Sequence, residues 1–158
     1  YYKDEIEDKD RIVTGWGASL SGIWQFAQNT SLCFQGVYGK GISNYIQDIS
    51  GTGLDLVPNA TAEGKLKAFG AWGGYIGFSH NWSKVLTSNI MYSYARVLDR
   101  YGMPTTSYKY AQYAAANLFW DFSEYGSCAI EYVFGRRNDF NKDYGNASRI
   151  NTMIQYRF

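Results

Sequence analysis

The fold is decided by the last stretch of the sequence, Asn146-Ala147-Ser148-Arg149-Ile150-Asn151-Thr152-Met153-Ile154-Gln155-Tyr156-Arg157-Phe158. From residue 149 onward, even-numbered positions are apolar, aromatic or threonine. The odd-numbered positions are polar or charged, except for Met153. Because successive side chains of a β-strand point to opposite faces, this alternation predicts a strand with one apolar and one polar face.

The same alternation recurs upstream of this stretch. The seven predicted strands cover residues 12–26, 30–42, 65–81, 86–98, 108–121, 127–138 and 146–158. In the sixth, Ile130, Tyr132 and Phe134 alternate with polar or small residues such as Glu131. A period of two residues indicates strands rather than helices. The sequence therefore predicts an all-β fold, an antiparallel up-and-down meander of about seven strands.

Composition sets limits on the class of protein. A chain of 158 residues predicts one domain, and a net charge of +1 implies no polyanionic partner such as nucleic acid. The mean hydropathy is −0.36, and no apolar run reaches the ~18 residues that a transmembrane helix needs. Aromatic residues are 18% of the sequence. A transmembrane barrel agrees with these values, because only every second residue of its strands meets lipid.

The links between the predicted strands alternate in length. Short links cover residues 27–29, 82–85 and 123–126, whereas long links cover residues 43–64, 99–107 and 138–145. Bacterial outer-membrane barrels have short periplasmic turns and longer external loops, and their last strand typically ends on an aromatic residue. This comparison predicts that Phe158 is periplasmic and that the acidic segment 1–11 is a solvated external loop.

Aromatic residues support this orientation, because they gather where lipid meets water. The predicted periplasmic interface contains Trp24, Phe26, Trp82, Trp120, Phe122, Tyr156 and Phe158. The opposite rim contains Trp16, Tyr38, Tyr94, Tyr110 and Phe134. The alternative is a soluble, lipocalin-like barrel with its apolar face inward. The parity of a residue number, odd or even, assigns a side chain to one of two faces but does not show which face points into the barrel. The loop lengths and the terminal Phe158 favour the membrane barrel.

An odd number of strands has a further consequence. Single-chain bacterial barrels have even strand numbers, and open sheet edges would leave unpaired N–H and C=O groups in lipid. We therefore expect residues 1–158 to be the C-terminal portion of one longer barrel domain.

Several segments resemble one family of such barrels. They are Gly15-Trp16-Gly17-Ala18-Ser19-Leu20-Ser21-Gly22, Gly36-Val37-Tyr38-Gly39-Lys40-Gly41-Ile42-Ser43-Asn44-Tyr45-Ile46, Phe78-Ser79-His80-Asn81-Trp82, Ala116-Asn117-Leu118-Phe119-Trp120 and Glu131-Tyr132-Val133-Phe134-Gly135-Arg136-Arg137 with the later Arg149-Ile150. In this order and spacing they resemble the C-terminal part of the DcaP-like porins. The resemblance implies a trimeric channel of the Gram-negative outer membrane for passive uptake of small solutes, including dicarboxylates for some members. The substrate class is not carried over, because selectivity depends on variable loops and lumen residues.

Parity assigns a set of polar residues to the lumen. The predicted pore-lining residues are Gln35, Tyr75, Asn89, Asn117, Glu131, Arg137, Arg149, Asn151 and Gln155. Arg137 and Arg149 are expected to approach each other near the external half, with Glu131 deeper on the same face. These charges either set ion selectivity or brace adjacent strands as ion pairs.

Other charges follow the same parity. Predicted lumen cations slightly outnumber the anions, which favours anionic solutes. The cations are Lys65, Lys67, Lys109, Arg137, Arg149 and Arg157, and the anions are Asp99, Asp121, Glu131 and Asp139. Arg96 and Arg136 have lipid-facing parity near external ends, so we expect them to reach the headgroup or lipopolysaccharide layer. The glycines around Lys40 favour an inward bend, so that loop 43–64 narrows the pore.

Catalytic and metal-binding chemistry finds little support in the sequence. His80, the single histidine, has lipid-side parity beside Trp82, which favours an interfacial role over a hydrolase site. Cys33 and Cys128 have opposite parity, so no disulfide between them is expected. No cofactor, metal site or catalytic residue is predicted.

The leading hypothesis is a water-filled outer-membrane porin for small polar or anionic solutes. The runner-up is a non-conducting barrel that serves as an adhesin, a receptor or a structural protein, and a membrane enzyme comes third. The small residues Gly15, Gly17, Ser19 and Ser21 are expected to leave open space in the lumen. The predicted partners are outer-membrane lipid, lipopolysaccharide, small polar solutes and two further copies in a homotrimer.

Overall fold

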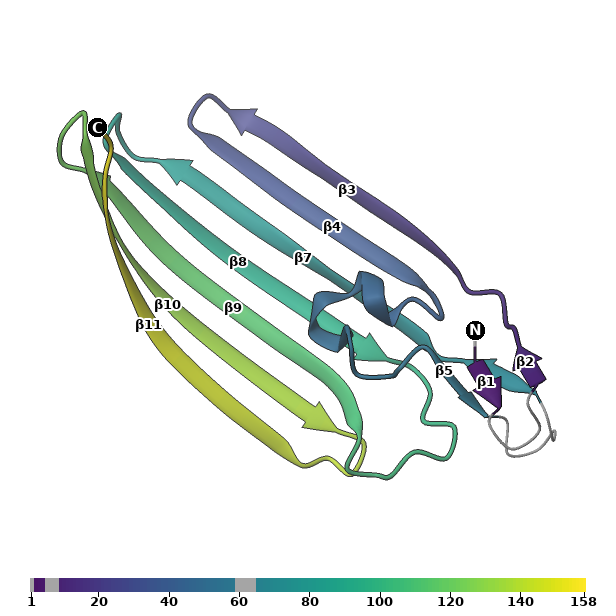
Figure 1. Cartoon of the computed structure of the whole chain (residues 1–158). Coiled ribbons are helices and arrows are strands. Elements are labelled where there is room, and N and C mark those ends of the chain that lie inside the picture. The colour runs from purple at the N-terminus through teal and green to yellow at the C-terminus, as the bar shows by residue number, and fades with distance from the viewer. Residues whose placement is uncertain (1, 5–8, 59–64) are drawn as a thin grey trace.

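Seven long strands form one curved sheet in the computed structural model of the chain (Figure 1), which describes residues 2–4, 9–58 and 65–158. The strands are β3 (Trp16–Ala27), β4 (Thr30–Lys40), β7 (Gly70–Asn81), β8 (Leu86–Val97), β9 (Tyr108–Asp121), β10 (Gly126–Asp139) and β11 (Tyr144–Tyr156). All neighbours are antiparallel, and their order is β11-β10-β9-β8-β7-β4-β3. The predicted meander is confirmed, and β3 does not pair with β11 within the described residues.

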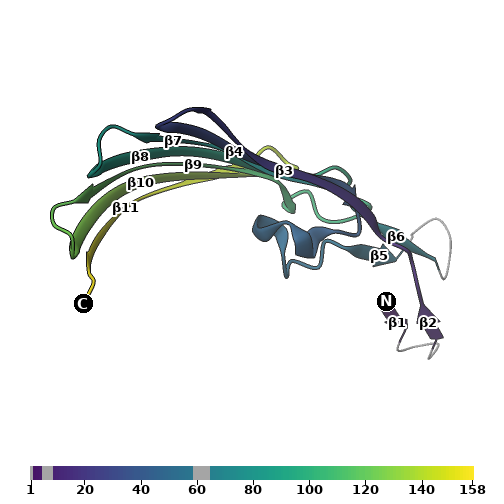
Figure 2. The same ribbon diagram turned by 90° about the horizontal axis from the view of Figure 1, so that it is seen from above.

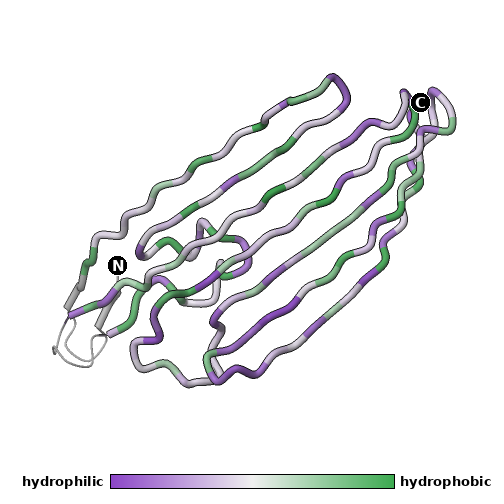
Figure 3. The backbone as a smooth tube through the Cα atoms, turned by 180° about the vertical axis from the view of Figure 1, so that it is seen from behind, coloured by the Kyte–Doolittle hydropathy of each residue, from purple (hydrophilic) through white to green (hydrophobic). Residues whose placement is uncertain are grey.

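The register gives each face of the sheet a parity. Glu131 lies opposite Asn117 on one side and Asn151 on the other, and Ile130 lies opposite Leu118 and Thr152. Directly paired residues of antiparallel strands point to the same face. Odd-numbered side chains therefore share one face and even-numbered side chains share the other, so hydropathy alternates along the strands (Figure 3).

The sheet arches, and the segment between β4 and β7 lies under its concave side (Figure 2). This segment contains η1 (Ser43–Tyr45), η2 (Gln47–Ile49), β5 (Leu56–Pro58) and β6 (Leu66–Ala68). It buries an apolar cluster against odd-numbered wall residues and Tyr108. The buried members are Ile42, Ile46, Ile49, Leu54, Phe69, Ala71, Ala95, Val97 and Tyr108. The odd-numbered side chains therefore point to the concave face. The segment covers this face at the end of the sheet where the longer links lie.

Three details differ from the prediction. The predicted strand 65–81 is divided at Phe69, whose side chain is 1% exposed, and β6 pairs with β5 inside the predicted loop 43–64. The predicted long link 138–145 is wrong, because β10 and β11 leave only residues 140–143 between them. This turn is closed by a 2.9 Å bond from the Asp139 amide to the Asp143 carbonyl.

The N-terminal segment also contains paired backbone. Within the predicted external loop 1–11, β1 (Tyr2–Asp4) pairs with β2 (Lys9–Arg11). Residues 1, 5–8 and 59–64 lie outside the described residues, and so do the side chains of residues 1–11. Among the described residues no helix is long and apolar enough to cross a membrane.

Candidate functional site

The nine predicted pore-lining residues all have odd numbers within the long strands, and the register brings them to the concave face. Gln35 lies opposite Tyr75 on the neighbouring strand, and Gln155 lies opposite Ser127. Arg137 and Arg149 are exposed on β10 and β11. The predicted division of side chains by parity is therefore observed, and it collects these residues on a single surface.

One row of polar side chains crosses this face from edge to edge. In strand order from β3 to β11 its members are Gln25, Ser31, Ser79, Asn89, Asn117, Glu131 and Asn151. We call these residues the polar row. It runs through the half of the concave face that the segment between β4 and β7 does not cover.

Hydrogen bonds within the polar row converge on Glu131. Asn89 Nδ2 donates to Asn117 Oδ1 at 2.8 Å, and Asn117 Nδ2 donates to Glu131 Oε2 at 3.3 Å. From the other side, Asn151 Nδ2 donates to Glu131 Oε1 at 2.9 Å. Both carboxylate oxygens of Glu131 therefore accept a hydrogen bond from a neighbouring asparagine amide. The row places one acidic side chain on the concave face.

The predicted cluster of Arg137, Arg149 and Glu131 is not formed as expected. Arg149 lies opposite Val133 and Arg137 opposite Gly145, so the two arginines are about 13 Å apart along the strands. Arg137 Nε instead forms a 2.9 Å ion pair with Asp139 Oδ1 on its own strand. The prediction failed because the two arginines lie at different distances from the turn: Arg137 is two residues before the end of β10, whereas Arg149 is five residues after the start of β11.

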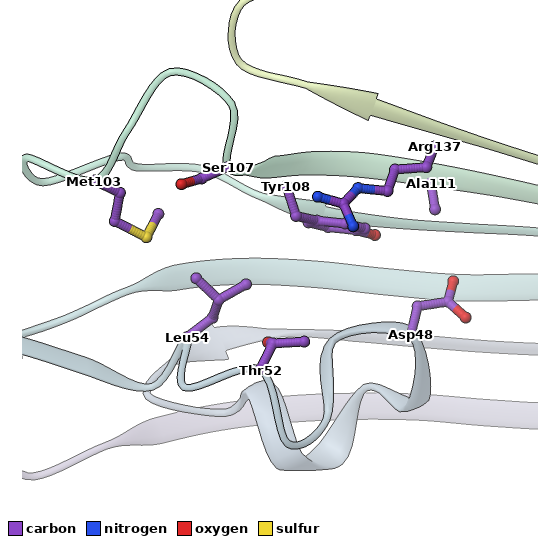
Figure 4. Close-up of a pocket in the computed structure, with 8 residues that line it drawn as sticks. All are labelled: Asp48, Thr52, Leu54, Met103, Ser107, Tyr108, Ala111 and Arg137. Carbon is purple, nitrogen blue, oxygen red and sulfur yellow. The ribbon is translucent and has the colours of Figure 1, made fainter. Parts of the chain in front are cut away.

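Arg137 faces the segment between β4 and β7, which we call the covering segment, across an open space (Figure 4). Asp48 from η2 and Arg137 from β10 point into a cavity of about 480 Å³, which Tyr108 and Met103 also line. The Arg137 guanidinium lies 5.6 Å from the centre of the Tyr108 ring. An anionic group on the covering segment and a cationic group on the wall therefore face each other near one end of the sheet.

Asp55 fixes the shape of the covering segment. Its carboxylate accepts a 2.7 Å bond from the Ser43 amide at Oδ1 and a 3.1 Å bond from Asn44 Nδ2 at Oδ2. The Asp55 carbonyl also accepts a 3.0 Å bond from the Phe69 amide. These bonds hold η1 beside the β5–β6 hairpin. They therefore fix the backbone of the segment that carries Asp48.

Small wall residues accommodate this segment. A Cβ atom added at Gly73 would lie 3.1 Å from Ile46 Cγ2, and one added at Gly17 would lie 3.1 Å from Ile42 Cγ2. Ile42 thus approaches the wall at Gly17, while Gly15, Gly17 and Ser19 still line a cavity of about 480 Å³. Open space remains beside Gln35 and Tyr75, which line a cavity of about 570 Å³ between wall and segment.

A second loop, residues 98–107, adds to the rim. Lys67 Nζ lies 4.0 Å from the centre of the Tyr101 ring, so this predicted lumen cation is held against an aromatic face. Burial raises the pKa of Tyr101 above its ordinary value, and a hydrogen bond with Asp99 raises that pKa further. Tyr101 is therefore a neutral packing residue at physiological pH.

The convex face is apolar and exposed. Trp24, Leu118, Ile130 and Ile154 are 63%, 41%, 53% and 84% exposed. At the end with the longer links, aromatic contacts run between neighbouring strands, including Trp72–Tyr94 at 4.8 Å and Tyr94–Tyr110 at 5.5 Å between ring centroids. At the other end the predicted interface aromatics are exposed as well; they are Trp24, Phe26, Trp82, Trp120, Tyr156 and Phe158.

His80 and the cysteines lie apart from any catalytic arrangement. His80 Nδ1 is 2.8 Å from Thr30 Oγ1, and its ring packs against Trp82 with centroids 4.4 Å apart. Cys33 and Cys128 are both free thiols. Across the described part of the chain, no group of three or more His, Cys, Asp or Glu side chains could hold a metal ion.

Sequence reasoning predicted that loop 43–64 bends inward, but it missed Asp48 and the residues through which the segment docks. Asp48 was not singled out, because parity applies only to strands and Asp48 lies on η2. The sequence did contain an indication that this segment docks, because the apolar residues Ile42, Ile46 and Ile49 recur every three or four positions. Those residues provide the buried side of the covering segment.

Known proteins add a comparison at the level of the fold. No family model and no curated protein matches the sequence. The structure is similar to the crystal structure of the outer membrane channel DcaP of Acinetobacter baumannii, with a TM-score of 0.76 and 20% sequence identity. The similarity covers 98% of this chain and 43% of that channel, so the chain spans less than half of the channel's length. The resemblance expected from the sequence is thus confirmed for the fold, since the seven-stranded meander matches part of the fold of that channel.

Proposed function

We propose that this chain forms part of the wall of a water-filled outer-membrane porin for small polar or anionic solutes. The observation that carries the proposal is the division of the sheet into an exposed apolar convex face and a concave face crossed by the polar row. In a membrane barrel the convex face meets lipid, and polar residues face the water inside. The similarity to a channel fold supports the same reading.

The covering segment gives the proposed pore its narrow part. It projects from the wall on the concave side and is fixed by buried Ile49 and Val97, each 0% exposed. Asp48 and Arg137 then act across the opening, where charges of opposite sign orient polar solutes. Deeper in the pore, solutes pass the negative charge of Glu131.

The intact protein is proposed to be a homotrimer in the outer membrane, with its short turns toward the periplasm. This orientation places the covering segment and residues 98–107 at the external end. Cross-linking of intact cells and the mass of the purified protein test the subunit number directly.

Conductance of the full-length protein in planar bilayers tests the porin proposal. Stepwise channels are expected whose ion selectivity responds to Glu131→Gln and Arg137→Gln, both on the concave face. Ile130→Thr on the convex face is the matched control, which should leave selectivity unchanged. A well-folded protein that inserts without conducting would instead support the adhesin or receptor alternative.

A further inference from the structure

The convex face carries charge in a one-sided pattern. At the even-numbered positions of the seven long strands, the only Lys, Arg, Asp or Glu residues are Lys40, Arg96 and Arg136. All three are cations, and all three lie toward the end of the sheet at which residues 41–69 and the loop 98–107 connect the strands. The lipid-facing surface of the proposed porin is therefore cationic at its external rim and free of carboxylates along these strands.

Aromatic rings hold Arg96 in place. It lies on β8 opposite Trp72 of β7 and Tyr110 of β9. Its Nε is enclosed and has no hydrogen-bond partner, while the side chain as a whole remains partly exposed. The stem is thus packed, and the guanidinium forms a hydrogen bond with the Tyr94 side chain.

Arg136 is held in a similar way on β10. Its guanidinium carbon lies 4.1 Å from the centre of the Tyr144 ring, and its Nε donates to Asn138 Oδ1 at 3.1 Å. Stacking on an aromatic face leaves the edge of a guanidinium free for bidentate bonds to an oxyanion. Neither arginine forms an ion pair with a carboxylate within the described part of the chain, in contrast to Arg137.

The register brings the two arginines within reach of one ligand. Only β9 separates their strands; Arg96 lies opposite Tyr110 and Arg136 lies opposite Gln112, two positions further along. Strand spacing and rise then place their Cα atoms about 12 Å apart. Two long side chains at this separation can bind one phosphorylated sugar headgroup.

We propose that Arg96 and Arg136 form a binding site for the phosphate groups of the glycolipid in the external leaflet, with Lys40 extending the same cationic rim. The proposal rests on the outer-membrane location given above. Arg–phosphate pairs are strong because the guanidinium fork matches the oxyanion geometry. The polyanionic external leaflet supplies that anion, whereas a second copy of these strands offers no carboxylate on its convex face.

Native mass spectrometry of the full-length protein tests this site, with bis-phosphorylated lipid A as the probe. The double variant R96Q/R136Q should lower lipid A affinity at least about tenfold, because two charge-assisted contacts are lost. R149Q is the matched control: it removes an exposed arginine from the concave face, so its affinity should equal that of the wild type. Dephosphorylated lipid A should bind the wild type as weakly as lipid A binds the double variant.

Further measurements keep the result interpretable. R96K/R136K retains the charge without the bidentate fork and should bind with intermediate affinity; it also replaces the double glutamine variant if that variant does not fold. Equal lipid A binding by wild type and R96Q/R136Q overturns the site, as does equal binding of the dephosphorylated lipid. A double variant that dissociates into protomers would show a contact between copies instead. Conductance of the same samples separates the two proposals, since lipid A binding without conduction refutes only the porin function.

Discussion

The two halves of the concave face differ in what covers them. At one end, odd-numbered wall residues such as Ala71, Ala95 and Val97 are buried by the covering segment and are at most 2% exposed. In the other half, Asn89, Asn117 and Glu131 of the same sheet are partly exposed and bond to one another. The strands and the alternation are the same in both halves.

The difference shows that the parity of a residue predicts which face of the sheet its side chain lies on. It does not predict whether that side chain is exposed to water or buried by another segment. Small and aliphatic residues at lumen parity mark where another part of the chain docks, because apolar surface is stabilised by burial. Asn, Gln, Ser and Glu at the same parity mark where water is expected. The comparison therefore separates two parts of one concave face: a buried docking surface, which we call the dry anchor, and a more exposed polar surface, which we call the wet half.

The largest expected effect comes from placing a charge in the dry anchor. Ile49→Asp should undock the covering segment, because burying an unpaired carboxylate costs several kcal/mol. Cleavage within residues 43–57 by added protease should become at least about 100-fold faster, and single-channel conductance should rise.

Tyr45→Asp is the control for this experiment. Tyr45 belongs to the same segment but is 80% exposed, so its substitution should leave both protease resistance and conductance near the wild type. If Ile49→Asp behaves like Tyr45→Asp, the covering segment does not depend on its buried cluster.

A smaller effect is expected from filling the space that the wall leaves for the segment. Gly73→Val should destabilise the docked segment by about 1–3 kcal/mol, because its Cβ alone would approach both Ile46 and the Tyr94 carbonyl. Gly36→Val is the matched control on the neighbouring strand, since an added Cβ there meets nothing within 4 Å. Thermal unfolding and protease resistance measure both. Equal loss in the two variants would indicate a general strand effect.

Charge substitutions compare the two halves directly. Arg137→Glu at the covered end should shift selectivity toward cations, and Glu131→Gln in the polar row should shift it toward anions. A unit charge acting on an ion across water at about 4 Å is worth about 1 kcal/mol, or about fivefold in relative permeability. Reversal potentials in salt gradients measure these shifts.

Arg149→Glu tests whether a charge placed in the wet half of the concave face, close to the polar row, affects ion selectivity. Arg149 is exposed and lies two residues from Asn151 of the polar row on the same face, so the shift should again be toward cations. Unchanged selectivity together with a lower unfolding temperature would make Arg149 a structural brace.

The smallest effect is expected within the polar row. Asn117→Ala removes the donor to Glu131 and the acceptor for Asn89. Because these side chains are partly exposed and water can replace the bonds, the loss should be about 0.5 kcal/mol. Gln155→Ala, on the same face, should cost less in the same thermal unfolding assay. A cost above about 2 kcal/mol for Asn117→Ala would mean that the row is a structural network rather than a solvated wall.

Most of the fold was predictable because period-two alternation is a local property. The face of each residue, the meander and the short turns follow from it, as Glu131 and Ile130 illustrate. Residues 28–29 between β3 and β4 lie within a short link that the sequence predicted.

The rest depends on contacts between distant segments. Strand 65–81 was predicted as continuous, but Phe69 is buried in the apolar cluster of the covering segment and interrupts the strand. Arg137 and Arg149 are separated because they lie at different distances from turn 140–143, which the register of β10 and β11 makes explicit. Asp48 lies at the site because its segment packs against the sheet. The alternation of residues along strands gives no information on such packing.

The most direct test of the central account uses the two native cysteines as probes of the two faces. Cys33 lies opposite Gly77 on the concave face, and Cys128 lies opposite Trp120 and Ile154 on the convex face. Each is spin-labelled in turn in the full-length protein in lipid vesicles, with all other cysteines replaced. The account predicts that a water-soluble nickel chelate relaxes the label at Cys33 more strongly, whereas oxygen dissolved in lipid relaxes the label at Cys128 more strongly. The reverse pattern would place lipid on the concave face and contradict the porin wall.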